Sequence, residues 1–177
     1  MRSLLISAAA LALAACNQSE PAKTEAKAEP AAQPAGMLEA RVNMAQIAPA
    51  KAKAMMHHRH ESMEVIGDNF KALRRELGGS SPNMKTVAAS AATIDKLAKE
   101  SAGWFPAGTG PEVGKTEAKA EIWRNPQDFN AKHTAFQKSA IAFNAAARSG
   151  NAGTAKAAFG DLGKSCKACH DLYREEH

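Results

Sequence analysis

Five residues near the end of the chain, Cys166-Lys167-Ala168-Cys169-His170, limit what this sequence can fold into more than any other feature. The two cysteines are three positions apart, so on a helix both thiols lie on the same side, one turn apart. Each thiol can then add to one vinyl group of a single porphyrin, and the neighbouring imidazole can bind its iron. This is the C-x-x-C-H signature of covalent c-type haem attachment. We expect Cys166 and Cys169 to anchor one haem c, with His170 as its proximal iron ligand.

Two other uses of a cysteine pair are weighed against this interpretation. A redox-active pair of the thioredoxin type opens a helix after a strand, and no strand is suggested here. A zinc site would need further cysteines, and the chain has only three in all. A helical thiol or metal-trafficking protein without haem stays as the third functional hypothesis, and such a protein would be colourless.

The N-terminus has the pattern of an export signal. A basic start, Met1-Arg2, precedes an apolar run from Leu4 to Ala15, which is too short to span a bilayer as a mature helix. The run ends in Leu13-Ala14-Ala15-Cys16, which resembles the lipobox of bacterial lipoproteins. We expect residues 1–15 to be a lipoprotein-type signal peptide and Cys16 to carry lipid. The alternative is a plain secretory signal cut after Ala15, with Cys16 incidental.

Residues 16–46 are predicted to form a tether between the membrane and the folded domain. They are rich in Ala, Pro, Glu, Lys and Gln and contain few large apolar residues to bury. Asn17 is not the aspartate usually associated with retention in the inner membrane, which favours the outer membrane.

The net charge of +5 falls to +4 when the signal with Arg2 is removed. Basic residues are scattered, which makes nucleic acid an unsuitable partner and leaves acidic redox proteins as candidates.

The remaining residues, 47–177, are predicted to form an all-α, antiparallel four-helix bundle. Ala dominates and Val is rare, which argues against a sheet. Apolar residues recur every three or four positions in four segments, as in a bundle. The segments begin near Pro49, near Ser81-Pro82, near Asn125-Pro126 and at about Thr154, with Gly78-Gly79 and Gly150 as stops. The connection from Gly103 to about Arg124 is long, and such loops are often functional.

The domain from Ala48 to His177 resembles a class II cytochrome c, the cytochrome c-prime family with its low-spin relatives. In these bundles C-x-x-C-H lies close to the C-terminus, whereas class I cytochromes c carry it near the N-terminus. Three stretches carry the resemblance: Ala158–His170, the loop Trp104-Phe105-Pro106-Ala107-Gly108-Thr109-Gly110 continuing to Glu121-Ile122-Trp123, and Arg59-His60-Glu61-Ser62-Met63.

The resemblance implies roles for two residues of the first helix. Met63 is at the family's distal position and is either a sixth iron ligand or a packing residue, since methionine fills apolar gaps well. A coordinating thioether would raise the reduction potential. Arg59, one turn away, corresponds to an arginine that pairs with a haem propionate; the alternative is a solvated side chain. His57, His58 and His60 are expected to be solvated, and so is His133.

We therefore expect a periplasm-facing, membrane-tethered c-type cytochrome that transfers one electron through iron ligated by His170 and Met63. It would exchange electrons with redox proteins of the periplasm and would not be an enzyme. The alternative is a five-coordinate cytochrome c-prime that binds or sequesters diatomic gases, NO or CO. A homodimer is compatible with either function, because class II bundles commonly pair through their first helices.

Overall fold

The computed structural model describes residues 47–176 of the chain. The predicted signal peptide, the lipidation site Cys16 and the tether over residues 16–46 lie outside the described residues. Within residues 47–176, no helix is both long enough and apolar enough to cross a membrane.

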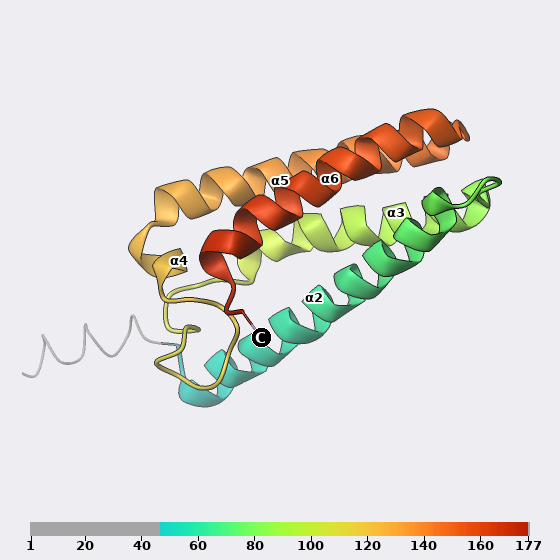
Figure 1. The fold of residues 1–177 in the computed structure, drawn as a ribbon. Helices are drawn as coiled ribbons and strands as arrows, with labels where there is room; N and C mark the ends of the chain where they lie inside the picture. Colours follow the sequence, from blue (N-terminus) through green and yellow to red (C-terminus); the bar gives the residue numbers. More distant parts are fainter. Residues whose placement is uncertain (1–46, 177) are drawn as a thin grey trace, which may run out of the picture.

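The structure is an all-α bundle, as the sequence predicts (Figure 1). Its four long helices run in alternating directions, α2 packing on α3, α3 on α5 and α5 on α6. A single 3₁₀ turn and a short helix lie in the long connection. The elements are α2 (Pro49–Gly78), α3 (Met84–Glu100), η1 (Ser101–Gly103), α4 (Glu121–Arg124), α5 (Pro126–Arg148) and α6 (Ala152–Tyr173).

The helix boundaries follow local chemistry, with two differences from the prediction. Asn83, not Ser81, caps α3, because its side chain accepts hydrogen bonds from the backbone amides of Lys85 and Thr86. Asn151 caps α6 in the same way, so this helix begins two residues before Thr154. At the end of α5, Gly150 has a φ of +75°, the left-handed conformation in which glycine avoids a steric cost.

The apolar faces of the four long helices form one main core. Its members come from the positions that the periodicity marks, and Phe143 is its largest fully buried side chain. A smaller cluster of Ile122, Phe129 and Tyr173 lies where α4, α5 and the end of α6 meet. The buried residues of the main cluster are Ile66, Leu73, Leu77, Val87, Ala91, Ile94, Ala98, Trp104, Phe136, Ala140, Phe143, Ala147, Ala155 and Leu162.

One polar contact crosses the bundle between α3 and α5. The Asp95 carboxylate is buried, accepts a hydrogen bond from Asn144 at 2.8 Å and pairs with Lys99 at 2.9 Å. These bonds satisfy Oδ2 of Asp95, whereas Oδ1 of Asp95 and Oδ1 of Asn144 have no partner among the described residues. The contact fixes how α3 and α5 lie against each other. Shifting either helix would leave the buried Asp95 carboxylate without its hydrogen bond from Asn144.

Replacing the central core residue tests this packing. We expect Phe143→Ala to lower the free energy of unfolding by about 3–5 kcal/mol, because it removes a fully buried ring and leaves a cavity. Chemical denaturation of the mature protein measures the loss. Ile141→Ala, two residues away at an exposed position, should change stability by less than about 1 kcal/mol. Equal effects of the two substitutions would contradict the assigned core.

Candidate haem-attachment site

Helix α6 presents the two cysteines of the C-x-x-C-H motif toward the interior of the bundle. Cys166 and Cys169 are both half-buried, and α6 is continuous through them. Cys166 packs against the main core, whereas Cys169 packs against the smaller cluster that contains Phe129 and Tyr173. The thiols therefore lie one turn apart, at the boundary between two apolar regions.

The electrostatics of the thiols argue against a redox-active pair. Burial, reinforced by the nearby Cys169, raises the pKa of Cys166 to about 11. Burial also raises the pKa of Cys169, and Lys132 opposes that shift. Reactive cysteines have lowered pKa values, so these thiols lack that property. Among residues 47–176, no group of three His, Cys, Asp or Glu side chains is placed to hold a metal ion.

His170 follows the second thiol directly and is exposed at the surface of α6. Partial burial of the imidazole against the protein lowers the pKa of His170, and the positive charge of Arg174 lowers it further. Asp171 and Glu117 oppose this shift. The imidazole is therefore neutral at pH 7, which is the form that binds a metal. Two thiols and a neutral imidazole within one helical turn fit the donor set of a covalently attached haem.

The long loop holds the end of α6 in place. The backbone amide of Lys119 donates to Tyr173 O at 3.0 Å, and the amide of Glu175 donates to Glu117 O at 2.8 Å. Arg174 adds an ion pair to Glu117 at 2.8 Å. The turn that carries His170 is thus bounded on its C-terminal side by a short two-stranded contact.

The Tyr173 hydroxyl contributes a further link from α6 to α5. It donates to the Asp128 carboxylate at 2.5 Å. Burial and this carboxylate raise the pKa of Tyr173 to about 12. The phenol therefore stays protonated and keeps its donor at neutral pH.

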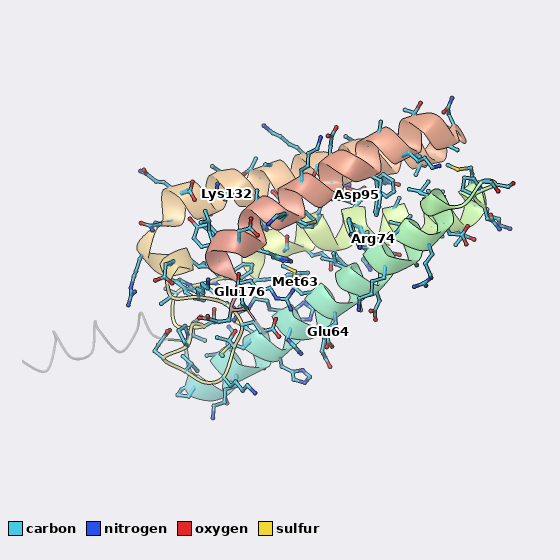
Figure 2. All side chains as sticks on the ribbon, viewed as in Figure 1. Met63, Glu64, Arg74, Asp95, Lys132 and Glu176 are labelled. Atoms are coloured by element: carbon cyan, nitrogen blue, oxygen red, sulfur yellow. The ribbon has the colours of Figure 1, made fainter. Side chains whose placement is uncertain are left out.

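Met63 lies across the bundle from this motif, on α2. Its side chain is half-buried, packs against the same main core as Cys166 and points inward in Figure 2, whereas the adjacent Glu64 is exposed. The buried residues of α2 around Met63 are apolar Met56 and Ile66 together with polar Arg59 and Ser62. The structure thus places a thioether on the helix that faces α6.

Arg59 is buried, with 4% of its surface exposed, so the alternative of a solvated arginine is wrong. Its guanidinium donates to Trp104 O at 3.1 Å, to Thr109 O at 3.0 Å, and to the hydroxyls of Thr109 at 3.2 Å and Thr116 at 3.1 Å. The ring of Phe105 lies 5.0 Å from it. Burial lowers the pKa of Arg59 and Glu112 opposes the shift. No carboxylate forms an ion pair with it among residues 47–176.

Comparisons with known proteins agree with this geometry. The family model for Cytochrome C' matches residues 54–174. Cytochrome c' of Alcaligenes xylosoxydans xylosoxydans is 34% identical over 128 residues, covering 72% of this chain and 98% of that protein. The chain belongs to the cytochrome c' family. Cytochrome c-556 of Agrobacterium tumefaciens is 37% identical over 117 residues, covering 66% of this chain and 93% of that protein.

A solved structure shows the same likeness. The nitric oxide complex of a cytochrome c prime variant from Alcaligenes xylosoxidans is 30% identical, with a TM-score of 0.63, and the match covers 74% of this chain and 99% of that one. Cytochromes c' are periplasmic haem proteins rather than enzymes, and this family member carries one covalent haem c. The family, fold class and cofactor predicted from the sequence are therefore confirmed.

The remaining predicted site residues differ in their surroundings. His57 pairs with Glu61 at 3.2 Å and His60 with Glu64 at 3.5 Å, and these four side chains are exposed. His133 was expected at the surface but is half-buried, because α5 turns it toward η1.

The sequence did not predict the hydrogen-bond partners of Arg59. Thr109 and Thr116 are 50 and 57 positions away along the chain. No local spacing signals such a contact, since the loop must fold back onto α2 before the residues meet. The only sequence signal for this contact is that the loop is rich in aromatic residues and threonines.

Arg59 gives a second test. We expect Arg59→Gln to lower the free energy of unfolding by about 2–4 kcal/mol, because it leaves buried loop carbonyls without donors. Amide hydrogen exchange should speed up over residues 104–116 and stay unchanged in α5. Arg75→Gln, at an exposed position of the same helix, serves as the control. Unchanged exchange in the loop would show that Arg59 does not hold it.

Proposed function

We propose that this cytochrome c' binds diatomic gases, NO or CO, at a five-coordinate haem, and that Met63 packs beside the binding position without ligating iron. The observation that carries the proposal is the likeness to cytochrome c prime of Alcaligenes xylosoxidans, whose solved structures include nitric oxide complexes at 28–30% identity. The sequence alone favours electron transfer and leaves gas binding as the alternative.

The side chains of α2 suit such a role. The side chains of Met63, Ile66 and Phe70 carry no proton donor and no charge, so a neutral diatomic molecule loses little by lying against them. Water and polar anions would have to give up hydrogen bonds that these three side chains do not replace. The apolar face therefore favours small neutral ligands over water.

The opposite side of the site is held by α6. Cys166 and Cys169 would form the two thioether bonds, and neutral His170 would supply the proximal nitrogen. When bound, the haem supplies an iron centre with one open coordination position. The backbone hydrogen bonds of Lys119 and Glu175 restrain the chain just after His170. They would therefore help to keep the imidazole in position.

Arg59 is assigned to a haem propionate. A guanidinium with 4% exposure has no ion-pair partner among residues 47–176, and the Glu112 carboxylate offsets its charge only from a longer distance. Such a charge is costly unless an anion neutralises it. A propionate carboxylate meets this need and has the planar geometry that guanidinium binds well.

One-electron transfer with Met63 as the sixth ligand is the second candidate. It is favoured by the position of the Met63 thioether on the inward face of α2 and by the 37% identity to a cytochrome c-556. A sulfur ligand would stabilise the reduced state and exclude gases. Redox proteins of the periplasm would then be the partners.

Optical spectroscopy separates the two functions. For a five-coordinate haem, we expect the reduced protein to show a broad visible band and to bind CO and NO readily. Met63→Ala should then leave the spin state unchanged, and Met55→Ala, at another half-buried position two turns earlier on α2, is the matched control. Sharp, split bands that resist CO, lost only in Met63→Ala, would establish the electron carrier instead.

The mature protein is proposed to be tethered to the outer membrane through lipidated Cys16. The support is the small-residue run Leu13-Ala14-Ala15 before the cysteine and the Asn17 that follows it. Members of the family are often dimeric, and a homodimer is assigned to this protein too.

Metabolic labelling tests the anchor. We expect the mature protein to incorporate radiolabelled palmitate and to fractionate with outer membranes. Cys16→Ser should release it into the soluble periplasmic fraction with its haem attached. Processing of the unchanged protein to a soluble, unlabelled form would establish a plain secretory signal.

A further inference from the structure

A partly open cavity lies outside the haem-attachment motif. It has a volume of about 330 Å³ and is lined by η1, the loop that follows it, α4 and the first turns of α5. Small-molecule pockets in proteins begin at about this size. Its lining within the described chain contains no Asp, Glu, Lys or Arg, so it is not built for an ion.

Three aromatic side chains form its walls. Phe105 and Phe129 meet edge to face with ring centroids 4.9 Å apart, and Trp123 lines the same cavity. The indole N–H of Trp123 already donates to Phe105 O at 3.2 Å and Pro106 O at 3.1 Å. The walls therefore offer ring surfaces, which favour a flat aromatic occupant.

His133 lines this cavity, and its ring carries one hydrogen-bond acceptor. The Ser101 hydroxyl donates its only proton to Ala98 O at 2.7 Å, so it must accept at its 2.8 Å contact with His133 Nε2. His133 Nε2 therefore carries the proton. Burial lowers the pKa of His133, so the ring is neutral at pH 7 and Nδ1 keeps its lone pair. Among the described residues, Nδ1 has no hydrogen-bond partner.

From this geometry we propose that the cavity binds a small neutral phenolic ring, with its face against Phe105, Phe129 and Trp123 and its hydroxyl donating to Nδ1 of His133. Aromatic walls select the ring, and the acceptor on His133 selects an O–H donor. The exposed amide of Asn130 lines the same cavity and can meet a second polar substituent. The site is independent of the gas-binding proposal.

The cavity is also close to the haem-attachment motif. Phe105, Trp123 and Phe129, which line the cavity, pack in the same small cluster as Cys169. A bound phenol would therefore touch the walls of both sites.

Isothermal titration calorimetry of the mature protein at pH 7 tests the proposal with phenol and anisole. The two probes share a ring, but anisole has no hydroxyl proton. We expect phenol to bind with a dissociation constant of about 1 mM and anisole about tenfold more weakly, the difference made by one neutral hydrogen bond. Equal affinities, or no binding of phenol at 10 mM, would overturn the proposal.

Two variants locate the binding. His133→Leu should weaken phenol binding about tenfold and leave anisole unchanged, whereas Trp123→Leu should weaken both. His60→Leu, at an exposed position of α2, should change neither. A crystal structure of the unmodified protein with phenol decides the matter even if a variant misfolds. The ring must occupy this cavity with its hydroxyl at Nδ1, and any other position rejects the site.

Discussion

The position of two thiols and an imidazole within one turn of α6 is the constraint on which the rest of this structure depends. A porphyrin attached through Cys166 and Cys169 must lie against the side of the helix that carries both sulfur atoms. That side faces the bundle, so the remaining helices have to provide apolar surface there. The main core meets this demand at Cys166 and the small cluster meets it at Cys169. High thiol pKa values follow from the same burial.

The second organising feature is a buried positive charge. Arg59 is enclosed by the long loop, and its donors satisfy two carbonyls and two hydroxyls of that loop. A loop without long elements of its own is thereby fixed to α2, and its far end is fixed to α6 through Glu117, Lys119 and Tyr173. The loop thus joins the two helices that carry Met63 and His170. Within the described chain Arg59 forms no ion pair and only Glu112 acts on its charge from a longer distance, which is the basis of the propionate proposal.

The family assignment and the site geometry answer different questions. The match to cytochrome c' identifies the cofactor and its covalent attachment, while the side chains of α2 decide what can reach the iron. Met63 is compatible with ligation and with packing. Gas binding is preferred because relatives with the same bundle are solved as nitric oxide complexes. The aromatic cavity beside His133 belongs to neither function and extends the chemistry of this end of the bundle.

The sequence by itself determined the C-x-x-C-H motif, the four long helices and their buried faces, because each depends on residues three or four positions apart. Phe143, Leu162 and Ile94 are buried where that periodicity places them. Tertiary structure decided the surroundings of Arg59 and His133, whose partners are 32 to 57 positions away. It also decided that the two anchoring cysteines contact different clusters. Such contacts depend on how the loop closes onto the helices, and that closure leaves no periodic trace in the sequence.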